Sequence, residues 1–275
     1  MKINQRISIS IILIIFLLGL ASNSIFTLRA LGVFAQNTDS IPKTVPRTVL
    51  VELFVQEGCL TCPTAEFCLE DLAYEYGTTK FILVQEHLWG DGYDTAETNA
   101  RYNWYVGDGK KGTPDVFING LTKRLQGLAC ECVEGNYECY KDAIDEELTR
   151  PSLLKLSASK IKVEPDYIIE GTVKNISDIP LEDLAICGMA SREGDDPGLY
   201  NYIQDVFPFQ NIPPLLPGGT FSFKFVPEIS LIQEDEAEGG KDEDKESDEE
   251  KDTLYLIIFV QNTETKEVLQ VLYVE

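Results

Sequence analysis

The sequence has little histidine and little positive charge. His87 is the single histidine among 275 residues, so a metal site or catalytic centre that needs two or more imidazoles is excluded. The chain holds 23 Lys and Arg against 46 Asp and Glu, and its formal net charge is −23. Such a charge repels phosphate backbones, so we expect no nucleic-acid partner. The 44% of hydrophobic residues is nevertheless enough to form a packed core.

The N-terminal segment predicts export. Lys2 and Arg6 precede the uncharged, largely apolar stretch 7–28, a pattern typical of a secretory signal peptide. We therefore expect residues 1–35 to form a signal peptide or, because about 20 apolar residues can cross a bilayer, a single N-terminal membrane anchor. The protein would then be periplasmic, in the cell envelope or extracellular. Disulfides form and persist there, which suits the seven cysteines.

The next segments predict an α/β domain. Residues 36–47 are polar and contain prolines, which favours a short linker. Over residues 48–150 the apolar periodicity predicts the order strand, helix, strand, helix, strand, strand, helix. A strand–helix–strand unit implies parallel strands, and Asn119-Gly120 predicts a hairpin, so we expect a mixed sheet flanked by helices. The expected strands are 48–55, 80–86, 115–119 and 123–126, and the expected helices are 63–76, 95–106 and 140–148.

The pattern changes after Pro151. Seven short, alternating segments and no helix predict an all-β, immunoglobulin-like sandwich over residues 152–275. Within it, the strongly acidic run 234–252 predicts a disordered insertion. A calcium loop is disfavoured there, because no glycine stands where such a loop turns. The expected strands are 153–159, 167–174, 184–190, 200–207, 220–226, 254–261 and 267–274.

The motif that carries chemistry is Cys59-Leu-Thr-Cys62, between the first strand and the first helix. Free N–H groups and the helix dipole favour an anion there, which lowers a thiol pKa from about 8.5 towards about 3.5–7.5. Cys59 at the exposed end suits attack on a disulfide, and Cys62 one turn further in suits resolution. The motif indicates thiol–disulfide exchange with a protein thiol or disulfide, and this chemistry needs no cofactor.

Three more candidates belong to the same sheet edge. Thr113-Pro114 precedes an antiparallel strand and His87 follows a parallel one, so the topology brings both to the edge where the CxxC motif lies. His87 is either a thiolate partner or a structural histidine. Glu52, inside the first strand, either serves as general base for the resolving thiol through water or is an edge-facing carboxylate.

These motifs together resemble the thioredoxin superfamily. Within it, V-E-L-F-x-x-x-G-C-x-x-C-P, H-x-W/Y-x-D and T-P-x-x-x-x-N-G look like a secreted thioredoxin-like family of undefined function. The added β-sandwich resembles thioredoxin-like outer-membrane proteins of some bacteria. The matching residues are Val51-Glu52-Leu53-Phe54, Gly58-Cys59, Cys62-Pro63, His87, Trp89, Asp91, Thr113-Pro114 and Asn119-Gly120.

The resemblance covers residues 48–150 and implies roles for its residues. It implies Cys59 as nucleophile, Cys62 as resolving thiol, and Pro114 as a cis-proline that binds substrate backbone together with Thr113. Gly58 and Leu60-Thr61 depart from thioredoxin itself. The direction of electron flow, whether reduction, oxidation or isomerisation, therefore stays open.

The remaining cysteines leave several functions open. We expect Cys68, Cys130, Cys132 and Cys139 to staple a loop through disulfides. The alternatives are a relay dithiol that passes electrons to the CxxC pair, or a thiolate site for copper(I). Cys187 is expected to be a buried small hydrophobe. The alternative to an oxidoreductase is a thioredoxin-fold binding or envelope protein with a static Cys59–Cys62 disulfide.

Overall fold

The computed structural model describes residues 43–127, 137–163, 166–194, 199–227 and 254–274, which belong to one compact unit, Pro42–Glu275. The predicted signal or anchor segment and the acidic insertion lie outside these residues, as does most of the linker. In the described part of the chain, no helix is both long and apolar enough to span a bilayer.

The first half of the chain follows the predicted order of elements. Strand β1 pairs in parallel with β2 and antiparallel with β3, and β3 and β4 form the predicted hairpin. The ends of these elements shift by only one or two residues from the prediction. The elements are β1 (Val49–Val55), α2 (Cys62–Tyr76), β2 (Phe81–His87), α3 (Ala96–Val106), β3 (Asp115–Ile118), β4 (Lys123–Gln126) and α4 (Glu138–Leu148).

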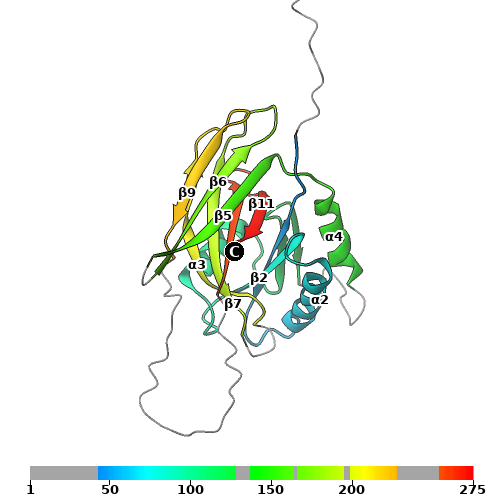
Figure 1. The fold of residues 1–275 in the computed structure, drawn as a ribbon. Coiled ribbons are helices and arrows are strands. Elements are labelled where there is room, and N and C mark those ends of the chain that lie inside the picture. Colours follow the sequence, from blue (N-terminus) through cyan, green and yellow to red (C-terminus); the bar gives the residue numbers. More distant parts are fainter. Residues whose placement is uncertain (1–42, 128–136, 164–165, 195–198, 228–253, 275) are drawn as a thin grey trace, which may run out of the picture. The chain divides into compact units, whose positions relative to one another are not determined.

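The second half contains the seven predicted strands. They enter two sheets, one with the order β11-β10-β7-β8-β2-β1-β3-β4 and one with the order β5-β6-β9 (Figure 1). The larger sheet crosses the boundary expected near Pro151, because β8 pairs in parallel with β2 at Gln85 and Tyr202. The strands are β5 (Leu154–Val163), β6 (Asp166–Asn175), β7 (Leu184–Arg192), β8 (Tyr202–Ile212), β9 (Thr220–Phe225), β10 (Leu254–Asn262) and β11 (Val268–Tyr273).

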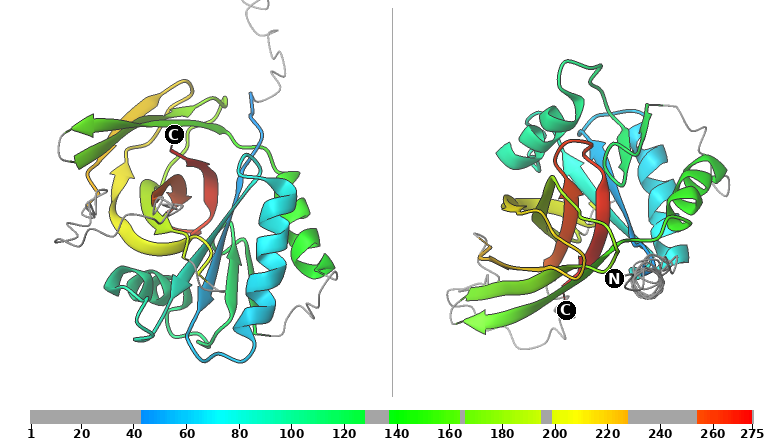
Figure 2. Two further views of the ribbon diagram at one scale, coloured as in Figure 1. Left: turned by 60° about the horizontal axis from the view of Figure 1, so that its bottom comes forward. Right: turned by 90° about the horizontal axis from the view of Figure 1, so that it is seen from above.

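Strand β1 is buried on both faces. Its residues Val49, Val51, Leu53 and Val55 pack in one apolar cluster with α2 and α4. Its alternate residues point the other way, since successive side chains of a strand leave opposite faces. Figure 2 shows α2 and α4 together on one side of this part of the sheet and α3 on the other.

The second half of the chain covers the α3 side of β1 and β2. Leu50 of β1 shares a buried cluster with residues of β7, β10 and β11, among them Cys187, Met189 and Phe259. The opposite faces of β7 and β10 pack on β5, β6 and β9 in a further cluster. The larger sheet therefore curves until its second half lies over its first.

Cys187 is a free, buried thiol, as expected for a small hydrophobe, and burial raises its pKa to about 12.

A buried ion pair of the first half also hydrogen-bonds to the second half. Glu52 of β1 is fully buried and accepts hydrogen bonds from Arg101 Nε and, at 2.6 Å, from the Tyr105 hydroxyl, both on α3. Arg101 also donates to Gln261 of β10 at 3.3 Å. Burial, and then the Glu52 carboxylate, raise the pKa of the neighbouring Glu86 well above its ordinary value.

Replacing Arg101 with methionine would leave Glu52 buried without a counter-charge. We expect Arg101→Met to lower the free energy of unfolding by about 3–5 kcal/mol, measured by urea unfolding. Adding Glu52→Gln should recover most of that loss, because it removes the unpaired charge. Lys123→Met, which breaks an exposed pair with Glu146, is the matched control and should change stability by less than about 1 kcal/mol. Equal losses in the single and double variants would contradict this assignment.

Glu86 should make the stability of the protein depend on pH. In the unfolded chain the carboxyl has the ordinary glutamate pKa of about 4.3, whereas in the folded protein burial and the Glu52 carboxylate raise its pKa well above that value. The folded state therefore binds more protons above that pH, and its stability should fall as pH rises, by up to about 1.4 kcal/mol per pH unit. Glu86→Gln should remove this slope in the pH range just above the unfolded glutamate value of about 4.3. An unchanged difference between the two proteins across that range would refute the assignment.

Candidate functional site

The CxxC motif lies where β1 ends and α2 begins. Gly58, at a φ of 78°, makes the tight turn in which the Cys59 N–H donates to the Gln56 carbonyl at 3.1 Å. Cys59 and Cys62 form a disulfide. Cys62 is 2% exposed, whereas Cys59 is partly exposed. The Cys62 N–H donates to Cys59 Sγ at 3.1 Å, so the first turn of the helix already directs a donor at the outer sulfur.

The Thr113–Pro114 peptide bond is cis, as the resemblance implied. The register of β1 and β3 pairs Phe54 with Asp115, which brings Pro114 beside Val55 at the end of β1. Val55 in turn lines a cavity together with both cysteines. Pro114 therefore lies at the sheet edge where the topology predicted it.

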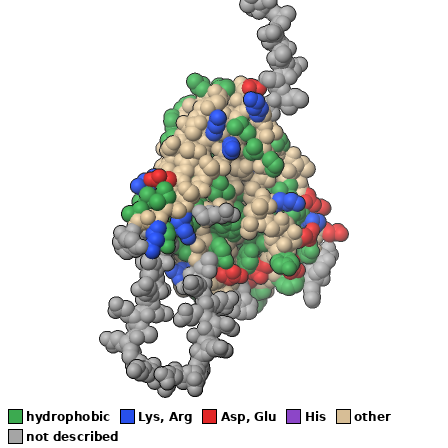
Figure 3. All heavy atoms as spheres, in the orientation of Figure 1, with side chains coloured by type: hydrophobic (Ala, Val, Ile, Leu, Met, Phe, Trp, Pro, Cys, Tyr) green, Lys and Arg blue, Asp and Glu red, His purple; other side chains and the backbone are tan. Residues whose placement is uncertain are grey.

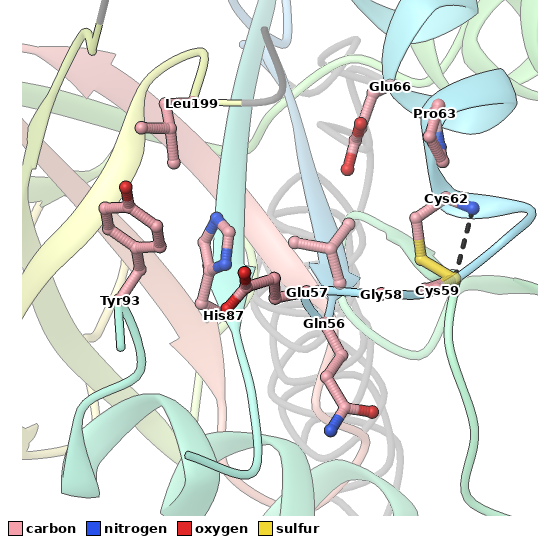
Figure 4. Close-up of a pocket in the computed structure, with 11 residues that line it drawn as sticks. Gln56, Glu57, Gly58, Cys59, Cys62, Pro63, Glu66, His87, Tyr93 and Leu199 are labelled. Atoms are coloured by element: carbon pink, nitrogen blue, oxygen red, sulfur yellow. Dashed lines mark hydrogen bonds between the residues drawn. A yellow bond between two sulfur atoms is a disulfide. The ribbon is translucent and has the colours of Figure 1, made fainter. Parts of the chain in front are cut away.

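A cavity of about 190 Å³ opens beside the disulfide. The two cysteines form one wall, His87 and Tyr93 stand across from them, and Glu66 extends from α2 into the space between (Figure 4). His87 thus reaches the edge where it was expected. Glu66 and Tyr93 were not predicted.

The hydrogen bonds of His87 fix its ring. Nδ1 donates to Asp91 Oδ2 at 2.7 Å, and the same carboxylate accepts from the backbone N–H groups of Glu57 and Tyr93, each at 3.0 Å. With the ring hydrogen on Nδ1, the neutral ring has a lone pair on Nε2. Nε2 is buried and has no hydrogen-bond partner among the described residues, while the ring lines the cavity.

Glu66 lies four residues after Cys62 on the same helix. Burial, and then the neighbouring Glu70, raise the pKa of the Glu66 carboxyl to about 7. The signal in the sequence was its spacing, since residues i and i+4 share a helix face. Its acidity alone did not distinguish it among 46 acidic residues.

Glu52 does not reach this site, which corrects the general-base role considered from the sequence. It leaves β1 on the face opposite to Leu53 and Val55, which pack with Cys62. Both of its oxygens accept hydrogen bonds from α3, from Arg101 and Tyr105. Its separation from the CxxC motif along the chain suited a general base, but successive side chains of a strand alternate between faces, and Glu52 projects from the face away from the cysteines.

The other cysteines are only partly described. Cys68 is fully buried in the cluster under α2, and both Cys68 and Cys139 are disulfide-bonded. This agrees with the predicted stapling for these two residues, while Cys130 and Cys132 lie outside the described residues. In the part of the chain that is described, no three His, Cys, Asp or Glu side chains group as a metal site. The copper(I) hypothesis therefore finds no ligand set there.

Comparison of this chain with known proteins gives information on its fold. No protein-family model and no curated protein matches the sequence. Among solved structures, HBP35 of Porphyromonas gingivalis is similar to this chain at a TM-score of 0.60 and 13% identity, over 84% of this chain and 75% of that one. At that identity the likeness extends to the fold alone.

Two glycosidases match shorter parts of the chain. β-Glucuronidase 2 of Bacteroides uniformis matches 43% of this chain and 12% of its own, at a TM-score of 0.27 and 17% identity. A β-glucosidase of Listeria innocua matches 46% of this chain and 16% of its own, at a TM-score of 0.25 and 19% identity. Scores this low do not indicate a shared architecture.

The Glu66 carboxyl should titrate near neutrality. In the oxidised protein we expect a midpoint at pH about 7, followed by carboxyl carbon NMR and assigned through Glu66→Gln. Glu70→Gln should lower the midpoint, because it removes a negative neighbour. Glu264→Gln, in an exposed turn, is the control and should leave it unchanged. A midpoint at the ordinary glutamate value would show that the side chain is not buried in this way.

Proposed function

We propose that the protein is a thiol–disulfide oxidoreductase that works outside the cytoplasm and exchanges disulfides with a protein partner through Cys59 and Cys62. The observation that carries the proposal is a disulfide at a helix N-terminus, with its outer sulfur accepting a helix N–H and its inner sulfur buried. The extracytoplasmic location rests on the N-terminal segment of the sequence.

We infer a thioredoxin-like arrangement for the first half of the chain. The order of its elements, a parallel β1–β2 pair beside an antiparallel β3 and a cis bond before Pro114 all support this. The second half then serves to position this domain or to bind a partner.

The exchange needs only the two sulfurs and the partner's thiols. A partner thiolate attacks Cys59 Sγ, a mixed disulfide forms, and the Cys59–Cys62 bond breaks with Cys62 leaving as a thiolate that takes up a proton. A second partner thiolate attacks the partner's sulfur in the mixed disulfide and releases Cys59. The partner loses two electrons and forms a disulfide, and the protein gains them. The reverse sequence reduces a partner disulfide.

The site favours Cys59 as the sulfur that meets the partner. Cys62 is 2% exposed, so an incoming thiolate reaches Cys59 first. On reduction, the Cys62 N–H and the helix dipole would stabilise a thiolate at Cys59. Leu60, 97% exposed beside it, offers an apolar contact for a polypeptide partner.

A redox titration tests the proposal. We expect the Cys59–Cys62 pair to equilibrate with glutathione at a potential above about −300 mV, read by alkylation and mass spectrometry. Reduced wild-type protein should cleave a fluorogenic peptide disulfide, Cys59→Ser should abolish cleavage, and Cys62→Ser should accumulate the mixed disulfide because resolution is lost. Cys187→Ala is the control for a cysteine outside the site and should remain active.

The static-disulfide alternative predicts a different outcome. The pair would then have a potential below about −300 mV and would react with neither glutathione nor the peptide. That result would overturn the proposed function.

A further inference from the structure

We propose that the cavity beside the disulfide is a specificity pocket for a cationic side chain, lysine or arginine, next to the reacting cysteine of the partner polypeptide. The inference rests on the proposed exchange reaction and names the substrate class of the same site. The disulfide forms one wall of the cavity (Figure 4), so its occupant would neighbour the cysteine that reacts with Cys59.

The polar groups of the pocket can accept hydrogen bonds. His87 is 6% exposed, and its Nε2 has no hydrogen-bond partner in the described part of the chain. Because Nδ1 donates to Asp91, Nε2 of the neutral ring can only accept. The Glu66 carboxylate and the Tyr93 hydroxyl can accept as well. A buried acceptor without a partner is unfavourable, and lysine and arginine supply only donors.

The charge around the pocket also favours a cation. Glu57 and Glu66 line it, no lysine or arginine is among its described lining residues, and Glu70 acts on Glu66 through space. Figure 3 shows acidic side chains gathered along the lower edge of the molecule, towards the side where α2 lies in Figure 1. With a formal net charge of −23, the protein would attract basic polypeptides over long distances.

The size and walls of the pocket fit one side chain. Its volume of about 190 Å³ is below the roughly 300–1,000 Å³ usual for drug-sized ligands. Val55, Pro63 and Leu199 give it apolar walls. Such walls suit the methylene stem of lysine or arginine, while its charged head reaches the acceptors.

The preference should depend on pH through Glu66. The groups that face its carboxyl are Glu70 on its own helix, His87 and Tyr93 across the cavity, and Glu57 from the loop before α2. Burial and Glu70 raise the pKa of Glu66 to about 7, so its negative charge appears as pH rises through neutrality. At lower pH the carboxyl is neutral, and the loss of its negative charge weakens the binding of a cation.

The test compares peptide disulfides that differ at one position. Reduced wild-type protein is mixed with disulfides whose cysteine is flanked by lysine, glutamine or glutamate, and the second-order rate constants are measured. Both rate constants depend in the same way on the fraction of Cys59 that is ionised, so this fraction cancels in the ratio of the lysine rate to the glutamine rate. We expect a ratio of about 10 at pH 8 that falls towards about 2 at pH 6, the size of effect usual for a hydrogen bond to a charged group. Added salt should reduce the ratio.

Variants locate the preference in the pocket. Glu66→Gln should bring the ratio close to 1 at pH 8, and Glu66→Lys should favour the glutamate peptide. Glu264→Gln, remote and exposed, should keep the wild-type ratio. Equal rates for all peptides with wild-type protein, or an unchanged ratio in Glu66→Gln, would overturn the pocket and leave the proposed function standing. Protein that reacts with none of the peptides would overturn the proposed function itself.

Discussion

Strand β1 is paired on both edges and buried on both faces, and this constraint positions the helices and the second half of the chain around it. Its odd-numbered side chains are committed to α2 and α4, and its even-numbered ones to α3 and the second half of the chain. The chain therefore reaches the surface only after Val55, where the strand ends. The turn at Gly58 then directs the chain into α2, so the disulfide lies where a rigid strand meets a helix N-terminus.

The face of β1 from which Glu52 projects is the one where buried polar groups link the two halves of the chain. Besides the bridge between β2 and β8 and the apolar cluster around Leu50, the halves are joined by a hydrogen bond from Arg101, the partner of Glu52, to Gln261 of β10. Further bonds lie near Arg47, which donates to Glu267 at 2.8 Å, and around Asn119. A buried ion pair with all partners in place specifies one arrangement of its elements, since any other would leave a charge unpaired.

The sequence was sufficient to predict the helices and strands, but not how the two halves of the chain pack together. Periodicity predicted every helix and strand, although β5 and β8 run four and five residues beyond their predicted ends. The topology predicted the shared edge of His87, Pro114 and the CxxC motif. Glu52 was misplaced because separation along the chain does not reveal which face of a strand a residue occupies. The packing of β7 on β1 was missed, although its nearly continuous apolar run, Leu184–Arg192, is typical of a strand covered on both faces.

The placement of Glu66 gives the two sulfurs different electrostatic surroundings. Cys59 Sγ receives a helix N–H, which favours a negative charge there once the disulfide opens. Cys62 is buried and lies one turn from Glu66, so a thiolate at Cys62 would meet desolvation and, above the Glu66 pKa of about 7, a like charge. Negative charge is therefore favoured on the outer sulfur and disfavoured on the inner one. The proposed reduction of a partner disulfide would use this asymmetry, because the outer sulfur would attack while the inner one stays protonated until a mixed disulfide forms.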